Sequence, residues 1–379
     1  MRNVIPEAVA WRGTNRIGFA LVGCGSFGRF SVGVYRSMDG LFLAAVSDPK
    51  ADLRDFNVPA FRDPLKAIHR ADVDLVYIAA PPSSHHALCM AALNAGKHVL
   101  CEKPLAMNSR QSHDMLELAS RKRLILAVNF MLRHSTIADL VKRAIDSRLF
   151  GSVLAAQFIN CAQDTALGHD HWFWSKAVSG GIFIEHGVHF FDLYRYWLGK
   201  VRVINAHLDR RNESQEDRAL CTLKYEVGAI VTHYHGFDQP LILDRAAHRL
   251  ICETGEILVR GWIPTELQMD GLVDEHGMGI LSRLFANCEV TEEPVAESRI
   301  VSRGTGRTVT WRVYVHYQAP PGRQDVYRAL LRDLMYDQLA YILDRRHERQ
   351  VVEQDGHAAL LVAEDAKRLG EQSWEQLKT

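Results

Sequence analysis

Short apolar runs and helical patterns alternate along the first third of the chain. The apolar runs predict strands at 17–22, 42–47, 75–79, 98–101 and 124–128. Apolar residues at helical spacing between them predict helices at 29–38, 64–69, 86–95 and 109–121. Strands this uniformly apolar are buried on both faces, and their alternation with helices is typical of a parallel sheet. We therefore predict a doubly wound α/β domain of the Rossmann type over residues 1–132, with 1–15 as a leader segment.

The pattern changes after about residue 133 to longer runs in which apolar and polar residues alternate. These runs predict strands at 152–160, 203–209, 220–225, 229–235, 249–253, 257–260 and 308–317. Turn residues around Glu226-Val227-Gly228 and Thr254-Gly255-Glu256 indicate two hairpins. Residues 133–379 are therefore expected to form an α+β domain on a large, mostly antiparallel open sheet.

Two helices are predicted at the C-terminal end of this second domain. The first covers 325–345, where apolar residues share one helical face. The second covers 356–369, with Asp355 as its N-cap and Gly370 as its stop.

The composition excludes some classes of partner. Lys and Arg number 45 and Asp and Glu also number 45, so no electrostatic signature favours nucleic acid or an anionic membrane. The seven cysteines are odd in number and lack CxxC spacing, which indicates reduced thiols in a cytoplasmic protein. No uninterrupted apolar run reaches the length of a membrane span, and the partner is expected to be a small molecule.

A glycine motif directly follows the first predicted strand. Gly23, Gly25 and Gly28 form GxGxxG, with Ser26 and Phe27 opening the next helix. Such glycines permit a tight turn, let the backbone approach a pyrophosphate, and let helix and strand pack closely. This context predicts a dinucleotide site.

Asp48 ends the second predicted strand, about 20 residues beyond the motif, where a carboxylate suits the adenosine ribose hydroxyls. It would repel a 2′-phosphate, so NAD is the preferred cofactor, while Lys50 nearby keeps NADP open. The alternative is that Asp48 only caps the turn after its strand.

Three further stretches resemble motifs of the Gfo/Idh/MocA family of NAD(P)-dependent oxidoreductases. Residues 101–106, CEKPLA, resemble the family's EKP motif, and 80–85, APPSSH, resemble its TPxxxH segment. Residues 180–192, GGIFIEHGVHFFD, resemble its GGxxxDxGxHxxD helix, with Glu185 where the family usually has Asp. The resemblance implies a Rossmann domain followed by a domain for substrate binding and oligomerisation, across about residues 16 to 370.

The spacing within the third stretch makes physical sense by itself. On a helix, Glu185, His189 and Asp192 project from one face. Carboxylates beside an imidazole fix its tautomer, and a base near neutrality is what alcohol oxidation requires. His186 points elsewhere and is expected to be a packing residue.

The resemblance implies roles for individual residues. His189 would be the general acid/base, Lys103 would stabilise alkoxide charge, and Glu185 would hydrogen-bond substrate or orient Lys103. The implied cofactor contacts beyond the glycine motif are Ala80, Pro81, His85, Glu102 and Lys103. The implied substrate contacts are Lys103, Arg133, Trp172, Glu185, His189 and Asp192. Arg133 as an ordinary solvated charge is an equal alternative.

Polar and aromatic residues in a loop ahead of this helix suit the binding of sugar hydroxyls. They are Asp164, His169, His171, Trp172 and Trp174, for which a plain loop role is equally open. A zinc site from His169, His171, Glu185 and His189 is an alternative, but the lysine and the dinucleotide motif account for the constellation, so no metal is expected.

The leading functional prediction is a dehydrogenase or reductase that interconverts a hydroxyl and a ketone on a sugar or cyclitol. Two alternatives use the same fold. One is a redox-neutral glycosidase or epimerase that oxidises its substrate transiently, and the other is a non-catalytic dinucleotide-binding regulator. The family resemblance also implies a homodimer or homotetramer packed through the open face of the second domain's sheet, and residues 309–315, a predicted strand with apolar residues on both faces, agree with it.

Overall fold

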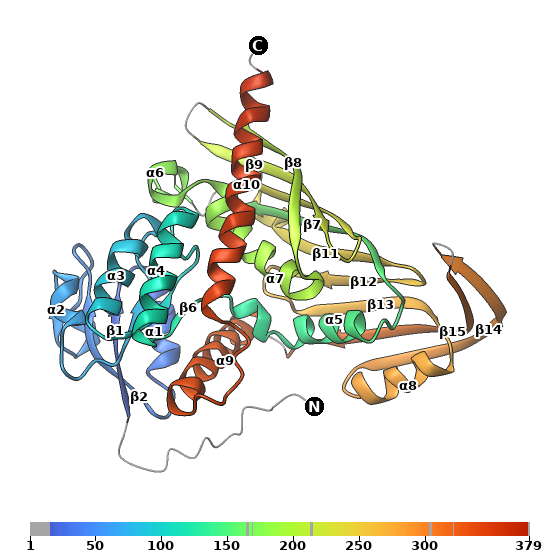
Figure 1. The fold of residues 1–379 in the computed structure, drawn as a ribbon, viewed down its shortest axis with the longest axis horizontal. Coiled ribbons are helices and arrows are strands. Elements are labelled where there is room, and N and C mark those ends of the chain that lie inside the picture. Colours follow the sequence, from blue (N-terminus) through green and yellow to red (C-terminus); the bar gives the residue numbers. More distant parts are fainter. Residues whose placement is uncertain are drawn as a thin grey trace. The chain divides into compact units, whose positions relative to one another are not determined.

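The computed structural model describes residues 16–163, 167–168, 170–212, 215–302, 305–320 and 322–377. The predicted leader 1–15, Asp164 and His169 lie outside these residues. The chain forms two compact units, each assembled from three segments (Figure 1). Unit 1 contains residues up to 131, 172–192 and 328–364, and unit 2 contains 132–171, 193–327 and 365–379.

The sheet of unit 1 is parallel throughout, with strand order β3-β2-β1-β4-β5-β6. The strands are β1 Ile17–Val22, β2 Leu41–Ser47, β3 Ala60–Phe61, β4 Leu75–Ile78, β5 His98–Cys101 and β6 Leu126–Val128. All six residues of β1 and all four of β4 are buried, as expected for a sheet covered on both faces. The doubly wound prediction is confirmed; only the two-residue β3 was not predicted, because it is too short to carry a pattern.

Four helices of unit 1 lie close to the predicted ranges: α1 Ser26–Tyr35, α2 Pro64–Ile68, α3 His85–Asn94 and α4 Ser109–Lys122. The short segments η1 Arg54–Phe56, η2 Pro82–Ser84, η4 Trp172–Trp174 and α6 Lys176–Ser179 were not predicted. Local chemistry fixes the starts of α2 and α4: the Asp63 side chain accepts from the amide of Leu65, and that of Asn108 accepts from the amide of Gln111.

The C-terminal helices are α9 Arg323–Leu343 and α10 Glu353–Leu377. The prediction that Gly370 ends the second helix is wrong, because α10 runs through it. The turns beyond Gly370 are held by tertiary contacts. Ser373 hydrogen-bonds His207, and Trp374 lies under the Arg210 guanidinium, 5.1 Å from the ring centre. Such contacts outweigh the cost of about 1 kcal/mol of a glycine within a helix.

Unit 2 is built on a nine-stranded sheet with the order β14-β15-β13-β12-β11-β7-β10-β9-β8. Its strands are β7 Val153–Gln163, β8 Val201–Arg210, β9 Glu216–Tyr225, β10 Ile230–Gln239, β11 Arg245–Cys252, β12 Gly255–Arg260, β13 Glu266–Val273, β14 Glu289–Ser302 and β15 Thr305–Gln318. Every pairing is antiparallel except that of β7 with β10. Both predicted hairpins are present, as β9–β10 and β11–β12.

Strand β15 shows how the expected apolar residues of 309–315 are distributed. Val309, Val313 and Val315 are buried on one face, whereas Arg312 and the exposed aromatic Tyr314 lie on the opposite face. β15 therefore shows the ordinary alternation of a strand covered on one side.

The remaining helical segments are η3 Met131–His134, α5 Thr136–Asp146, the π-helical turn η5 Phe183–Gly187, α7 Val188–Leu198, η6 Leu241–Leu243 and α8 Glu275–Leu284. In unit 2, Trp197 donates from its indole N–H to the Ala138 carbonyl at 3.0 Å, tying α7 to α5. Within the described residues, no helix combines the length and the apolar character needed to cross a membrane.

Candidate functional site

The glycine motif forms the turn from β1 into α1, and its geometry explains why these positions are glycine. Gly23 has φ +97°, and a Cβ there would lie 2.5 Å from the Ala79 backbone. A Cβ on Gly28 would lie 2.2 Å from the Gly23 carbonyl oxygen, so this glycine lets helix and strand pack closely. Gly25 has open space around it. Ser26 and Phe27 begin α1, whose N-terminal amides suit a phosphate.

Asp48 lies at the end of β2 and is tied to this turn. Its Oδ2 accepts from the Cys24 amide at 2.8 Å, and its Oδ1 accepts from the Lys50 and Ala51 amides at 2.7 and 2.8 Å. Burial opposes the carboxylate, but these three hydrogen bonds outweigh it and hold the pKa of Asp48 below its ordinary value. Asp48 therefore caps the turn and stays ionised, with further lone pairs for an incoming hydroxyl.

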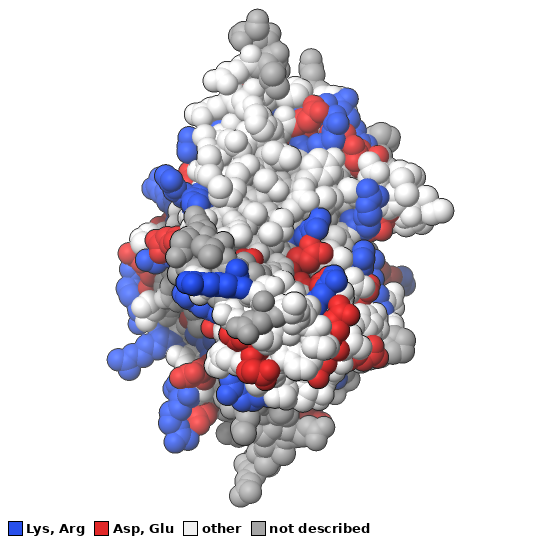
Figure 2. All heavy atoms as spheres, turned by 90° about the vertical axis from the view of Figure 1, so that its right-hand side faces the viewer, with Lys and Arg blue, Asp and Glu red and all other residues white. Residues whose placement is uncertain are grey.

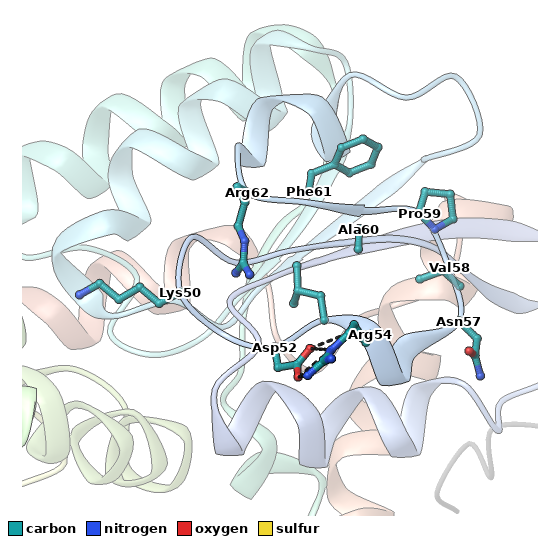
Figure 3. A pocket seen from close by; sticks show the side chains of 10 residues that line it. Lys50, Asp52, Arg54, Asn57, Val58, Pro59, Ala60, Phe61 and Arg62 are labelled. Atoms are coloured by element: carbon teal, nitrogen blue, oxygen red, sulfur yellow. Dashed lines mark hydrogen bonds and ion pairs between the residues drawn. The ribbon is translucent and has the colours of Figure 1, made fainter.

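Beyond Asp48, ten residues between Lys50 and Arg62 line an open pocket of about 800 Å³, and Figure 3 shows their side chains. Of its cations, Arg54 is paired with Asp52, and Arg62 donates to the Ala51 carbonyl at 2.6 Å. Both arginines lie exposed at the surface and make these contacts there.

The EKP segment follows β5. Glu102 is buried, and its Oε1 accepts from the Tyr77 hydroxyl at 2.7 Å and from Asn129 Nδ2 at 2.6 Å. The Tyr77 hydroxyl also lies 2.8 Å from the hydroxyl of Ser31 on α1. Burial raises the pKa of Glu102 to about 7, against the opposing effect of these hydrogen bonds. A hydrogen-bonded chain thus links the helix of the glycine turn to the EKP carboxylate.

His85 supports the same region. One ring nitrogen lies 2.6 Å from the Pro104 carbonyl and the other 2.8 Å from the Ala80 carbonyl, and burial lowers the pKa of its imidazole. The ring joins the loop after β4, which holds Ala80 and Pro81, to the loop after β5.

Lys103 and Glu185 are brought together within unit 1. Lys103 Nζ donates to the Glu185 carbonyl at 2.9 Å and forms an ion pair with the Glu185 carboxylate. The side chains are only 16% and 10% exposed. An ammonium has three N–H groups, so this arrangement leaves one for another acceptor.

Glu185 lies in the π-helical turn Phe183–Gly187, directly ahead of α7. The sequence predicts a regular helix here. The structure differs because the turn is wider, and π turns of this kind recur at functional sites. In the turn Phe183–Gly187, the main-chain carbonyl of Glu185 accepts a hydrogen bond from the Lys103 ammonium.

His189 is buried on the first turn of α7, with its ring 6.3 Å from that of Phe130. Burial, and then the nearby charge of Lys103, lower the pKa of His189 well below its ordinary value, so the imidazole is neutral at neutral pH. The expectation of a base near neutrality is therefore wrong for this structure, because burial and the lysine charge dominate. Asp192 is buried three residues further on. His186 packs against Phe190 at 5.1 Å between ring centres, as expected for a packing residue.

Arg133 lies in unit 2 and is buried, with its guanidinium 5.4 Å from the centre of the Tyr196 ring. The alternative of an ordinary solvated charge is therefore wrong. Trp172 opens η4 and is half-buried; Phe173 and Trp174 pack edge to face within the same turn.

No group of three or more His, Cys, Asp or Glu side chains in the described part of the chain is placed to hold a metal ion. His169, a member of the zinc alternative, lies outside that part.

Sequence reasoning missed Tyr77, Ser31 and Asn129 as site residues. A signal for Tyr77 was present: a buried tyrosine in an otherwise aliphatic parallel strand needs a partner for its hydroxyl. Ser31 and Asn129 carry no comparable signal, because their role depends on which strands and helices become neighbours.

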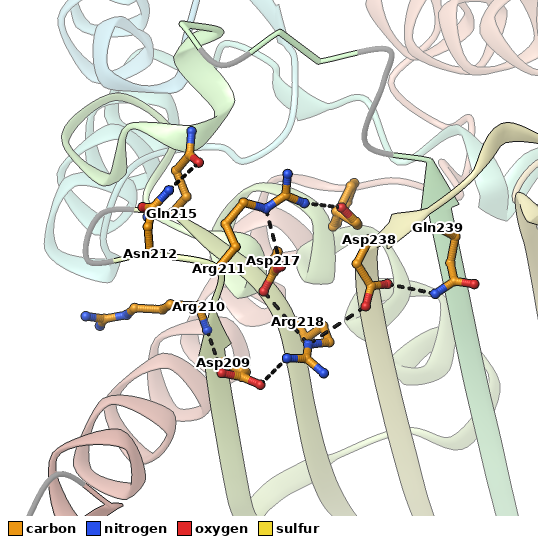
Figure 4. Close-up of polar contacts among 10 residues, drawn as sticks. Asp209, Arg210, Arg211, Asn212, Gln215, Asp217, Arg218, Asp238 and Gln239 are labelled. Carbon is orange, nitrogen blue, oxygen red and sulfur yellow. Dashed lines mark hydrogen bonds and ion pairs between the residues drawn. The ribbon is translucent and has the colours of Figure 1, made fainter.

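A second polar cluster lies in unit 2, at the ends of β8, β9 and β10 (Figure 4). Arg211 contacts Asp217 at 3.3 Å and donates to the Phe237 carbonyl, while Arg218 pairs with Asp209. Acidic and basic side chains pair with each other here, which indicates a role in holding three strand ends together.

Comparisons with known proteins bear on both units. Residues 17–130 match the family model described as an oxidoreductase family with an NAD-binding Rossmann fold. Residues 139–257 match the model for the GFO/IDH/MocA C-terminal domain. Together the two matches exceed half of the 379-residue chain.

Individual relatives share 18–30% of residues with this chain, and the sequence matches cover only part of it. A myo-inositol 2-dehydrogenase of Thermotoga maritima is 30% identical over 191 residues, 49% of this chain and 55% of that protein. Oxidoreductase P35 of Formosa agariphila is 26% identical over 253 residues, 57% of this chain and 79% of that protein. A levoglucosan dehydrogenase solved with NADH and L-sorbose superimposes with a TM-score of 0.75 at 18% identity, covering 95% of this chain and 98% of that one. At that identity the structural likeness concerns the fold.

Proposed function

This chain belongs to the GFO/IDH/MocA family of oxidoreductases with an NAD-binding Rossmann fold, and we propose that it interconverts a hydroxyl and a ketone on a sugar, sugar derivative or cyclitol. The observation that carries the proposal is the Lys103–Glu185 pair, which leaves a lysine N–H available near a buried, neutral His189. The names of its relatives, among them inositol, levoglucosan and glucoside dehydrogenases, support the substrate class.

The residues of unit 1 fit a dinucleotide. The open space at Gly25 accommodates a pyrophosphate against the start of α1, and Asp48 offers an ionised acceptor at the end of β2. When bound, the nicotinamide supplies the hydride acceptor or donor. We favour NAD over NADP, because the ionised carboxylate of Asp48 at the end of β2 opposes a 2′-phosphate.

The protein's own groups then handle the oxygen and its proton. The remaining N–H of Lys103 would hydrogen-bond the reacting oxygen and stabilise negative charge as it develops. Neutral His189 would accept the hydroxyl proton in oxidation and return it in reduction. The Glu185 carboxylate would hold the ammonium in place. Glu185 stands where the family usually has Asp, and its carboxylate reaches the Lys103 ammonium.

The first experiment offers NAD or NADP and a panel of inositols, aldoses, polyols and glycosides to the purified protein, and follows reduced-nicotinamide absorbance and product together. Net cofactor reduction with ketone product is expected. Product without absorbance change would replace the proposal with the redox-neutral alternative, and binding of dinucleotide without any turnover would favour the regulator.

The site assignment has its own control. Lys103→Met and His189→Ala should each lower kcat by about a hundredfold or more while NAD affinity stays nearly unchanged, because they remove interactions with the reacting oxygen. Lys66→Met changes an exposed lysine of α2 and should leave both quantities as they are. Full activity in Lys103→Met would refute the assignment.

We further propose that the protein forms homo-oligomers through the outer face of the unit 2 sheet. Leu220, Ile230 and Ile251 are exposed large apolar residues on β9, β10 and β11. Figure 2 shows a broad stretch of uncharged surface bordered by charged side chains. Light scattering tests this, and a monomeric mass would contradict it.

All seven cysteines are free, which supports a reducing compartment such as the cytoplasm.

A further inference from the structure

A second pocket in unit 1 lies where the C-terminal end of α4 meets the turn between α9 and α10. It has a volume of about 470 Å³. Its lining includes the apolar side chains of Leu116 and Leu124. It also includes three arginines, Arg123, Arg345 and Arg349.

These arginines differ in how many of their hydrogen bonds and ion pairs other protein groups already take up. Arg349 is fixed: its side chain is only 5% exposed, it donates to Gln338 Oε1 at 3.0 Å, and it pairs with Glu353 at 2.6 Å. Arg345 lies over the Tyr341 ring at 4.7 Å, and its Nη2 is 3.3 Å from the main-chain oxygen of Arg123. The guanidinium of Arg123 itself has no protein partner among the described residues.

The pocket therefore carries an excess of positive charge. Three guanidinium groups line it against one carboxylate, that of Glu353, which Arg349 already neutralises. The 25-residue helix α10 also begins at Glu353, so its N-terminal partial charge adds to the field. Close by, burial and then the charge of Arg345 lower the pKa of His98 to about 4. The cluster in Figure 4 differs, because its arginines are matched by aspartates.

The position of the pocket separates it from the dinucleotide site. His98 and Leu124 stand at or just before the amino-terminal ends of β5 and β6. The glycine turn, Glu102 and Lys103 follow the carboxyl ends of β1 and β5, at the opposite edge of the same sheet. Dinucleotides bind at the carboxyl edge, so this pocket is not part of that site.

We propose that this pocket binds the phosphate group of a small phosphorylated metabolite, with Arg123 and Arg345 as the principal ligands. Guanidinium groups match phosphate oxygens in pairs, and Arg349 supports them from a fixed position. The apolar side chains of Leu116 and Leu124 suit the carbon skeleton of the ligand, and Ser120 and Gln354 offer hydrogen bonds to its hydroxyls. Phosphate binding in this pocket does not depend on which reaction the dinucleotide site supports.

Isothermal titration calorimetry of the NADH-saturated protein tests the proposal, because bound cofactor blocks phosphate from the glycine turn. Inorganic phosphate and glycerol 3-phosphate are titrated at constant ionic strength, with glycerol and sodium chloride as controls. Both phosphates should bind, glycerol 3-phosphate more tightly, and the controls should not. Arg123→Gln combined with Arg345→Gln should weaken binding at least tenfold, since each change removes a charge-assisted hydrogen bond.

Arg121→Gln is the matched control, because Arg121 lies exposed on the same helix and only approaches Glu117, at 3.9 Å. Its affinity for phosphate should equal that of the unchanged protein. Absence of phosphate binding, or equal weakening in the control and the double variant, would overturn the proposal. Thermal unfolding of each variant confirms that it is folded.

Discussion

At the scale of single residues, the Lys103–Glu185 pair makes the sharpest prediction. Glu185→Gln removes the charge that holds the ammonium and should lower kcat by about ten- to a hundredfold, because a misplaced donor stabilises developing charge poorly. Glu185→Asp keeps the charge but shortens the side chain by one methylene, and should retain more activity than Glu185→Gln. Steady-state kinetics on the substrate found in the panel measures both. Equal activity in all three proteins would show that Glu185 does not position Lys103.

Glu102 makes a second prediction, about pH. Its pKa of about 7 is set by burial against hydrogen bonds from Tyr77 and Asn129, so it is expected to define the acid limb of kcat/KM. Tyr77→Phe removes a donor to the ionised carboxylate and should move this limb to higher pH. Ser31→Ala, which removes only the far partner of Tyr77, should move it less. A limb that both variants leave in place would assign the titration to another group.

At the scale of elements, the sheet of unit 2 carries a buried histidine cluster. His233 and His235 on β10 and His248 on β11 surround Phe158, with ring centres 4.6 to 5.6 Å from it. Burial lowers the pKa of His235 and of His248 to about 3, while an unfolded histidine titrates near 6.5. The unfolded chain therefore binds more protons, and the stability that the neutral rings contribute is lost as pH falls from about 6.5 towards 3.

The expected result is a melting temperature that falls on acidification, with His235 and His248 each costing about 2 kcal/mol of stability by pH 5. His235→Phe should flatten this dependence, because one titrating ring is gone. His69→Gln, which changes an exposed histidine, should leave it unaltered. Melting temperatures of the three proteins from pH 8 to pH 5 measure this difference. The same pH dependence in all three would show that His235 does not cause the loss of stability at low pH.

Elements were predictable where one pattern dominated locally. The strands of unit 1 and both hairpins follow from apolar runs and turn residues. β13 and β14 were missed because their apolar positions are interrupted by charged residues such as Asp270 and Glu293, whose side chains approach Arg312 across the sheet. The π-helical turn at Glu185 was also out of reach, since its width follows from tertiary contacts that no local spacing encodes.

At the scale of the whole molecule, the two units interleave along the chain. The sequence suggests a single boundary near residue 132, whereas unit 1 also contains 172–192 and 328–364. His189, Glu185 and the helices around residue 350 thus belong to the same unit as the glycine turn. The pattern of apolar and polar residues along the chain does not show that later segments pack in the first unit, because that depends on which surfaces bury each other.

A substitution at Gly356 on α10 tests directly whether residues 353–364 pack against the sheet of unit 1. A Cβ there would lie 2.5 Å from Val128 Cγ2 and 2.9 Å from Leu105 Cδ2, both buried in the parallel-sheet core. Val128 is β-branched and stiff, so Gly356→Ala should destabilise the protein by about 1–3 kcal/mol in urea unfolding. Gly279→Ala, on α8 with open space around it, should instead stabilise by about 0.5–1 kcal/mol through helix propensity. If both substitutions stabilised the protein equally, residues 353–364 would not be packed against the strands that carry the cofactor and EKP residues, and the interleaved organisation of unit 1 would be wrong.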